Sequence, residues 1–350
     1  MKVTFGIIGF GWMANWHVKK IIPPANAEVE IKAVYDIDEE RVKEGIRQGF
    51  TGYHSLEEFL EDNSFDNVLV ATPNSTHKDL VIAALRAGKN VVCEKPVTLN
   101  AEELEEIIRV AKETGRLFTV HQNRRRDRDY CIVKKAIADG LVGKPFFIES
   151  RVQGANGIPS DWRRQKEFGG GMLYDWGAHL VDQILQLVDS PVVEVYSHML
   201  NINYQVDDNF KAHLKFENGV SAQIEVDTAC FQPLPRWHVL GNKGTLNIQN
   251  WECEGNVVQG KVEEIDWGVD ASESAAGSTR TMRPRPEETT KNLPLPEVEV
   301  SWSEFYRNYR DVLEGKAELF VNPESVLRAV RVLDAIRESS EKGICVRCRL

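Results

Sequence analysis

The first third of the chain alternates short apolar runs with amphipathic stretches. Segments such as Ser75–Ala87 and Ala101–Thr114 space their apolar residues three and four positions apart, as one face of a helix does. Alternating strands and helices favour a parallel sheet with right-handed crossovers. Residues 1–122 are therefore predicted to form an α/β domain. Its strands are predicted over Val3–Ile8, Ile31–Tyr35, Asn67–Ala71, Asn90–Cys93 and Leu117–His121.

A different pattern begins at residue 123. From Val192 to Asn250 apolar and polar residues alternate, with turns at Asn218-Gly219 and Gly241–Gly244, which is typical of antiparallel strands. Residues 123–350 are thus predicted to form a second, α+β domain, whose terminal helix over 323–339 is expected to pack back near the first. Its other elements are predicted as a strand over Phe146–Val152 and helices over Tyr130–Asp139, Met172–Leu187, Ser301–Leu313 and Pro323–Glu338.

Residues 268–296 break the periodic pattern. They are rich in Ser, Thr, Pro, Arg and Glu, and they contain a basic cluster over 279–285. Such a composition is typical of a long surface loop, of a lid that closes over a ligand, or of a disordered segment. The sequence leaves these three interpretations open.

Composition restricts the classes of partner and compartment. With 43 basic and 53 acidic residues the net charge is −10, which argues against nucleic acid or an anionic membrane as the main partner. No apolar run reaches the roughly 18 residues that predict a membrane span. Six scattered cysteines indicate reduced thiols in the cytoplasm. Cys345 and Cys348 form a single C-x-x-C pair, a weak zinc signal without a second pair, so no metal is predicted.

A glycine fingerprint follows the first predicted strand. Gly9-Phe10-Gly11-Trp12-Met13-Ala14 has the G-x-G-x-x-A spacing between a strand and a helix. The first glycine permits the tight turn, and the second lets the backbone approach a pyrophosphate. Free N–H groups at the start of the helix then hold the phosphates. The sequence therefore predicts a dinucleotide-binding, Rossmann-type domain.

The second predicted strand ends in an acid. Asp36 lies 25 residues beyond Gly11. A carboxylate at this place accepts hydrogen bonds from the adenosine ribose and repels a 2′-phosphate. The first basic residue after it is Arg41. The sequence therefore favours NAD, with NADP the less favoured cofactor.

Two further segments carry chemistry. Lys95, in Glu94-Lys95-Pro96, ends a predicted strand on the side where a parallel sheet binds ligands. Asp175 and His179 are four residues apart, so on an α-helix they share one face about 40° apart. A histidine can take a proton from an alcohol near neutral pH, and a lysine can stabilise the alkoxide that forms. Asp175 would then orient the imidazole or bind a second hydroxyl.

Together these residues resemble the glucose–fructose oxidoreductase / inositol dehydrogenase (Gfo/Idh/MocA) family. The resemblance runs from the fingerprint through Ala71-Thr72-Pro73-Asn74 and Glu94-Lys95-Pro96 to the terminal helix, and so covers essentially the whole chain. It implies a Rossmann domain followed by a domain with a large open, mostly antiparallel sheet. One face of that sheet usually mediates dimers, which often pair into tetramers. The resemblance also implies that Lys95, Asp175 and His179 form the catalytic trio.

The remaining site residues follow from the same resemblance. The stretch 121–127, His-Gln-Asn-Arg-Arg-Arg-Asp, is similar to that of a subgroup that includes scyllo-inositol dehydrogenases and often prefers NADP, with Arg126 where the subgroup tends to carry Trp. Trp162 is expected to pack against the nicotinamide, a sugar ring or the core. The cofactor is expected to contact Gly9, Phe10, Gly11, Trp12, Met13, Asp36, Thr72, Pro73, Asn74, His77, Glu94 and Lys95. The substrate is expected to contact Asn123, Arg125, Trp162, Arg163 and Tyr174.

The function expected is NAD-dependent oxidation of a secondary alcohol on a sugar, glycoside or inositol-like polyol. The protein is expected to be a homodimer or homotetramer. Two alternatives stay open. The same residues would serve a redox-neutral reaction in which tightly held NAD oxidises a sugar hydroxyl transiently, as in an epimerase, a glycosidase or a sugar–sugar oxidoreductase. A non-catalytic NAD-binding regulator is the second alternative, although it has no need of the Lys95, Asp175 and His179 trio.

Overall fold

The computed structural model describes residues 2–25, 28–159, 161–261, 272–274, 277–279 and 287–350. Its N-terminal part contains a six-stranded parallel sheet in the order β3-β2-β1-β4-β5-β6. The order reverses at β1, and ligands of such sheets bind outside the carboxyl ends of the strands at that point. The strands are β1 (Val3–Ile8), β2 (Val29–Tyr35), β3 (Thr51–Tyr53), β4 (Asn67–Val70), β5 (Asn90–Cys93) and β6 (Phe118–Val120).

Helices connect these strands, and their ends carry the expected caps. The side chain of Asn100 accepts a hydrogen bond from the N–H of Glu103 at the start of α6, and Gly115 ends α6 with a φ of +64°. The described helices of this part are α1 (Trp12–Trp16), the π turn η1 (His17–Ile21), α2 (Ile22–Ala25), α3 (Glu39–Arg47), α4 (Leu56–Glu61), α5 (His77–Arg86) and α6 (Ala101–Thr114).

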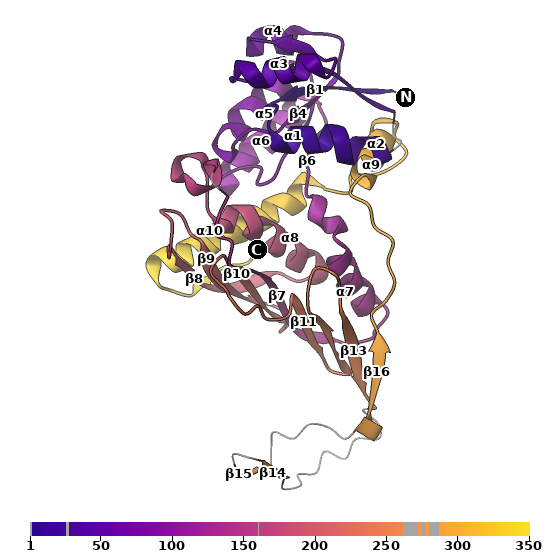
Figure 1. The fold of residues 1–350 in the computed structure, drawn as a ribbon, viewed down its shortest axis with the longest axis vertical. Helices are drawn as coiled ribbons and strands as arrows, with labels where there is room; N and C mark the ends of the chain where they lie inside the picture. The colour runs from indigo at the N-terminus through magenta and orange to yellow at the C-terminus, as the bar shows by residue number, and fades with distance from the viewer. Residues whose placement is uncertain (1, 26–27, 160, 262–271, 275–276, 280–286) are drawn as a thin grey trace.

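The second sheet has nine strands in the order β16-β13-β12-β11-β7-β10-β9-β8-β17 within the described ranges. Every neighbouring pair is antiparallel except β7 and β10. Figure 1 shows α8 and α10 between this sheet and the N-terminal part. The strands are β7 (Pro145–Gln153), β8 (Val192–Leu200), β9 (Asn209–Phe216), β10 (Ser221–Asp227), β11 (Trp237–Gly241), β12 (Gly244–Ile248), β13 (Gly255–Gly260), β16 (Thr290–Pro294) and β17 (Val346–Arg347).

The helices of the second part are α7 (Arg128–Ala138), α8 (Ala178–Leu187), α9 (Glu304–Leu313) and α10 (Pro323–Lys342). α7, α8 and α10 contact the strands of the nine-stranded sheet. α9 and the start of α10 instead join the core of the N-terminal part, through Tyr306, Tyr309 and Val326. The terminal helix therefore packs against both cores, as Figure 1 shows by its course from one part to the other. None of the helices in the described ranges is long and apolar enough to cross a membrane.

Three predicted elements differ from the structure. Met172–Leu187 is not one α-helix, because a π turn over Leu173–Gly177 precedes α8. Residues 290–294, predicted as part of a loop, form β16 and pair with β13. α9 begins at Glu304, one turn later than expected, because Ser303 rather than Ser301 precedes its first turn. The basic cluster over 279–285 lies outside the described residues from Arg280 onward.

Candidate active site

The loop after β1 passes close to the neighbouring strand β4. Gly9 has a φ of +87°, and its N–H donates to the carbonyl of Tyr35 at 2.8 Å. A Cβ at Gly9 would lie 2.6 Å from Cγ2 of Thr72, whereas at Gly11 it would meet only Arg41 within 4 Å. The first N–H groups of the helix that follows have no acceptor within the helix. This open loop therefore fits the pyrophosphate of a dinucleotide.

Asp36 is held by the backbone of the same loop. Its carboxylate accepts hydrogen bonds from the N–H of Phe10 at 2.7 Å and the N–H of Asp38 at 2.9 Å. Nη1 of Arg41 lies 3.6 Å from the same carboxylate. An acid that favours ribose hydroxyls and an arginine that favours a 2′-phosphate thus lie side by side.

Other residues predicted to contact the cofactor lie along the same crevice. Trp12 is 71% exposed and stacks on Trp16. Met13 is half-buried and packs against the core of the N-terminal part. Pro73 precedes the short helix η2 (Asn74–Thr76), and the buried Asn74 donates to the carbonyl of Gly169 at 2.8 Å. That hydrogen bond joins the first domain to a loop of the second.

His77 holds two of these loops together. Its ring is fully buried, and its two nitrogens lie 2.9 Å from the carbonyl oxygens of Thr72 and Pro96. Burial lowers the pKa of His77. A neutral imidazole carries one N–H and donates to one of these carbonyls at a time, so His77 links the loops of Thr72 and Pro96 beside the crevice.

Lys95 follows the end of β5 and contacts the second domain. Its Nζ donates to Oδ1 of Asp175 at 3.0 Å and to the carbonyl of Asp175 at 2.9 Å. Nε of Arg163 lies 3.4 Å from the same carboxylate oxygen. Burial by itself raises the pKa of Asp175, but the cations of Lys95 and Arg163 outweigh it and hold that pKa below its ordinary value. The carboxylate therefore stays charged and fixes the lysine between the two domains.

His179 begins α8 and is 3% exposed. Its Nδ1 is buried and has no hydrogen-bond partner among the described residues. Burial, and then the positive charges of Lys95 and Arg124, hold the pKa of His179 well below 6.5. The imidazole is thus neutral at neutral pH, which is the form that accepts a proton.

Asp175 and His179 lie in consecutive segments of the chain. A shared α-helical face was predicted for the two side chains, and in the structure Asp175 lies in the π turn over 173–177 while His179 lies in the first turn of α8. Among the described residues, Asp175 contacts Lys95 and Arg163, and no hydrogen bond joins it to His179. Of the two roles predicted for Asp175, the structure is compatible with binding a substrate hydroxyl.

The carboxylate of Glu94, for which a cofactor contact was predicted, is buried and bound within the protein. Its Oε1 lies 2.6 Å from Nε2 of His17 and 2.8 Å from Nδ1 of His121, and Nδ1 of His17 lies 2.6 Å from the hydroxyl of Tyr306. Oε2 accepts from the N–H of Lys95 at 3.1 Å. These short contacts describe a hydrogen-bonded cluster, because a tetrahedral metal would hold its ligand atoms about 3.3 Å apart.

Burial and charge shift the pKa values of this buried cluster. Burial and the neighbouring His121 lower the pKa of His17 to about 4. Burial by itself raises the pKa of Glu94, but the imidazoles of His121 and His17 outweigh it and hold that pKa well below its ordinary value. Glu94 is therefore a buried carboxylate that links η1, the ends of β5 and β6, and, through His17 and Tyr306, α9.

Two of the residues predicted to contact substrate, Arg125 and Tyr174, form hydrogen bonds within the protein. Arg125 is buried, and its guanidinium forms a two-pronged ion pair with Asp182 at 2.6 and 2.8 Å, so it joins the short helix η3 (Asn123–Arg126) to α8. Tyr174 donates its hydroxyl to the carbonyl of Leu99 and accepts from Arg337. The polar atoms of Arg125 and Tyr174 are thus already bound within the protein.

Of the other residues predicted to contact substrate, Arg163 contacts Asp175 and Trp162 lies beside Arg163. Asn123 is 7% exposed at the start of η3. Trp162 is half-buried in the short helix η4 (Trp162–Arg164), and the guanidinium of Arg163 lies 4.6 Å from the centre of its ring. Because Arg163 also contacts Asp175, Trp162 borders the Lys95–Asp175 pair.

One functional residue that the sequence did not suggest is Asp207. Its Oδ2 accepts from the N–H of Leu173 at 2.6 Å, and its carbonyl accepts from the N–H of Met172. Burial raises the pKa of Asp207 to about 7. Asp207 therefore holds the beginning of the π turn that carries Asp175. No motif marks it, because it comes from a turn far along the chain.

Both parts of the chain match a known protein family. Residues 3–122 match the oxidoreductase family with an NAD-binding Rossmann fold, and residues 130–247 match the GFO/IDH/MocA C-terminal domain. The chain belongs to the Gfo/Idh/MocA oxidoreductase family. It is therefore an oxidoreductase with an NAD-binding Rossmann domain, of a family that acts on CH–OH groups of sugars and inositols.

Within the Gfo/Idh/MocA family, the chain is 29% identical over 346 residues to scyllo-inositol 2-dehydrogenase (NADP(+)) of Bacillus subtilis, covering 97% of this chain and 94% of that protein. It is 27% identical to scyllo-inositol 2-dehydrogenase (NAD(+)) of the same organism, covering 71% and 74%. A crystal structure of an NAD-binding protein from Listeria innocua is 42% identical, covers 99% of both chains and superposes with a TM-score of 0.93. Relatives thus include both an NAD and an NADP enzyme.

Proposed function

We propose that this protein is a dehydrogenase that oxidises a secondary hydroxyl group of a sugar, glycoside or inositol-like polyol, with NAD preferred over NADP. The observation that carries the proposal is the contact of Lys95 with Asp175 across the two domains, beside a buried, neutral His179. The names of the inositol dehydrogenases among its relatives support a polyol substrate. Asp36, with its carboxylate at the end of β2, supports NAD.

The proposed reaction assigns a separate task to each residue. His179 takes the proton of the substrate hydroxyl, because its imidazole is neutral at neutral pH. The ammonium group of Lys95 stabilises the negative charge that grows on the substrate oxygen. Asp175, which Arg163 also contacts, holds Lys95 in place and offers a free lone pair to a second hydroxyl. A bound NAD, held by the loop after β1, would supply the acceptor for the hydride of the carbinol carbon, so that the alcohol would become a carbonyl.

The assembly and compartment belong to the same proposal. We infer a cytoplasmic homodimer or homotetramer, formed through the face of the nine-stranded sheet opposite α8 and α10. The six cysteines all lie in described ranges and are free, which supports a reducing compartment.

The test is a panel of inositols, aldoses and simple glycosides, each supplied with NAD or NADP and monitored at the absorbance of the reduced cofactor. Turnover with NAD for at least one inositol or sugar is expected. Tightly bound NAD with sugar conversion but no net reduced cofactor would replace the proposal with a redox-neutral reaction. Binding of NAD with no conversion of any compound would favour the alternative of a non-catalytic, NAD-binding regulator.

A further inference from the structure

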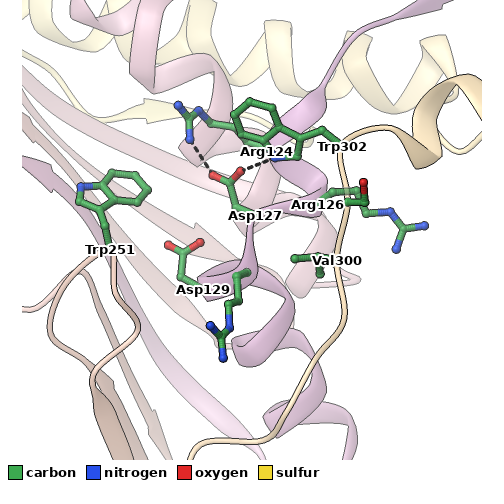
Figure 2. Close-up of a pocket in the computed structure, with 9 residues that line it drawn as sticks. Arg124, Arg126, Asp127, Asp129, Trp251, Val300 and Trp302 are labelled. Atoms are coloured by element: carbon green, nitrogen blue, oxygen red, sulfur yellow. Dashed lines mark hydrogen bonds and ion pairs between the residues drawn. The ribbon is translucent and has the colours of Figure 1, made fainter. Parts of the chain in front are cut away.

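A cavity of about 260 Å³ lies beside the candidate catalytic residues and is not lined by Lys95, Asp175 or His179. It opens between the start of α7, the tip of the β12–β13 hairpin and the segment that precedes α9. Figure 2 shows Trp251 on one side of this cavity and Val300 with Trp302 on the other, with Asp127 between them. We call this cavity the distal pocket.

Trp176 connects the distal pocket to the catalytic residues. It lies in the π turn between Asp175 and His179, and its ring centre is 5.9 Å from that of His179. The same ring is 5.5 Å from the ring of Trp251, and the guanidinium of Arg124 lies 4.1 Å from its centre. Trp251 and Arg124 line the distal pocket. The indole of Trp176 therefore lies between a substrate bound next to His179 and the distal pocket.

The tryptophans of the pocket are arranged as surfaces for a ring. Trp251 is 46% exposed at the tip of the hairpin, and the guanidinium of Arg236 lies 4.6 Å from the centre of its ring, so the exposed part of the indole is the surface open to a ligand. Nε1 of Trp302 donates to Oδ1 of Asp127 at 3.1 Å, which fixes the orientation of that indole. Indole faces bind the C–H surface of a sugar ring, and side chains such as Asp127 and Arg124 bind its hydroxyl groups.

Of the five charged residues that line the pocket, four are held in ion pairs, whereas Arg128 is exposed and forms no ion pair among the described residues. Arg124 contacts Asp127 at 2.8 Å, Arg126 contacts Glu304 at 2.9 Å, and Asp129 contacts Arg236 at 3.1 Å. A pocket built for a phosphate or carboxylate would present arginines without acidic partners. The pairing favours a neutral, hydroxyl-rich ligand. The volume is below the roughly 300–1,000 Å³ of pockets for larger ligands, and so suits a single ring.

We propose that the distal pocket binds the second ring of a disaccharide or glycoside whose first ring is oxidised beside His179. This inference rests on the proposed dehydrogenase function and narrows its substrate class to two-ring compounds. The two rings meet at Trp176, whose indole borders both sites. Trp251 supplies the stacking surface for the second ring.

The experiment compares single-ring compounds with two-ring compounds that contain them: myo-inositol with galactinol, and D-glucose with cellobiose and maltose. Wild-type enzyme, Trp251→Ala and Ile344→Ala are assayed with NAD. Ile344 is the matched control, since it has the same 46% exposure and lies at the far end of α10. For the favoured pair, we expect kcat/KM of the two-ring compound to exceed that of the single ring. Trp251→Ala is expected to lower kcat/KM of the two-ring compound about tenfold, through a higher KM at unchanged kcat. Ile344→Ala is expected to leave both constants unchanged.

The outcomes separate the inference from the function on which it rests. The enzyme could oxidise single-ring compounds, show no higher kcat/KM for the two-ring compounds, and be unaffected by Trp251→Ala. That result would overturn the proposed role of the distal pocket and leave the dehydrogenase function standing. Tighter binding of a sugar phosphate or uronic acid, lost in Arg124→Gln, would show an anion site instead. If no compound is oxidised, saturation-transfer NMR with cellobiose and galactinol measures binding without turnover. A signal that Trp251→Ala removes would support the pocket, and absence of any signal would overturn it.

Discussion

His179 is neutral at the pH of the cell because the folded protein makes its charged form unfavourable. Burial is the main cause, and the positive charges of Lys95 and Arg124 add to it. A base of this kind stays active when the pH falls below 6.5, the ordinary pKa of a histidine. The acid limb of a plot of kcat/KM against pH is therefore expected below pH 6.5. Measurement of kcat/KM from pH 5 to 9 tests this, and an acid limb at or above 6.5 would contradict it.

The roles proposed for Lys95 and His179 predict a large loss of rate with little loss of cofactor affinity. His179→Asn removes the base, and Lys95→Met removes the charge beside the substrate oxygen. Each is expected to lower kcat by roughly 10²–10⁴-fold. Single-turnover kinetics at saturating NAD and substrate measure this step. Lys78→Met, which removes a lysine paired with Glu106 at the surface, is the control. A His179→Asn enzyme with the wild-type rate would exclude His179 as the base.

The choice between NAD and NADP depends on Asp36 and Arg41. The carboxylate of Asp36 disfavours a 2′-phosphate, and the nearby guanidinium of Arg41 favours one. Wild-type protein is expected to bind NAD more tightly than NADP. Asp36→Ala should reverse the order, and Arg41→Ala should weaken NADP alone. Calorimetric titration of both cofactors tests all three statements. Tighter binding of NADP by the wild type would show that Arg41 outweighs Asp36.

At the scale of elements, the π turn depends on a glycine. Gly171 has a φ of +108°, and a Cβ there would lie 2.1 Å from Oδ1 of Asp207. Gly171→Ala is therefore expected to displace Asp207 and the turn, with a loss of about 2–3 kcal/mol in the free energy of unfolding and most of the activity. Gly115→Ala is the control, because its φ is +64° and nothing lies within 4 Å of its Cβ position.

Chemical denaturation and kcat distinguish these two glycine variants. Gly115→Ala should lose about 1–2 kcal/mol, the cost of the left-handed conformation, and keep its activity. Equal losses of activity in both variants would show that the contact between Gly171 and Asp207 does not position the site.

The cluster around Glu94 connects η1, the ends of β5 and β6, and α9. Two imidazoles share Oε1 of Glu94, and Oε2 accepts from the N–H of Lys95. A neutral amide keeps one oxygen for the imidazoles, but it removes the negative charge and sets an NH₂ group, which cannot accept, against the N–H of Lys95. Glu94→Gln is expected to cost roughly 1–3 kcal/mol of stability. If Glu94 also positions Lys95, kcat should fall while the affinity for NAD stays the same. Lower stability with unchanged kcat would restrict Glu94 to a structural role.

At the scale of the whole molecule, buried histidines predict sensitivity to acid. The pKa of His17 is about 4 when folded, and burial lowers that of His77 and His179 as well. Unfolded, each takes up a proton near pH 6.5, so the unfolded state binds more protons below that pH. The contribution of these three histidines to stability is therefore complete above pH 6.5 and is lost as the pH drops toward 4, by up to about 1.4 kcal/mol per pH unit for each histidine. The raised pKa of Asp207, about 7, acts in the opposite direction and offsets the share of roughly one histidine. Thermal melts from pH 8 to 4 test this, and a constant Tm would contradict it.

The outer face of the nine-stranded sheet bears on assembly. On this face Arg151 pairs with Glu149 and Glu225, and Lys211 also pairs with Glu225. The proposed oligomer would cover these groups together with exposed side chains such as Tyr196. Light scattering at micromolar concentration is expected to give a mass of two or four times the 39.7 kDa of one chain. A mass of one chain would contradict the proposal.

The sequence by itself determined the parallel domain and indicated several candidate site residues. β1, β5 and α6 occupy the predicted ranges, because short-range periodicity, an asparagine cap and terminal glycines specify them locally. The glycines of the fingerprint allow a tight turn and the close approach of a pyrophosphate, so residue types alone predicted the dinucleotide loop. Lys95 could be placed because a strand end in a parallel sheet always faces the ligand crevice.

Only the tertiary structure decided which of these residues meet. The sequence pattern could not show that Lys95 pairs with Asp175 across two domains, or that Arg125 is occupied by Asp182. The π turn was missed because its residues have ordinary helical periodicity, and it is Asp207, distant in sequence, that holds the start of the turn. Contacts between distant segments depend on how two cores pack against each other, and no local pattern of hydrophobic and polar positions records that packing.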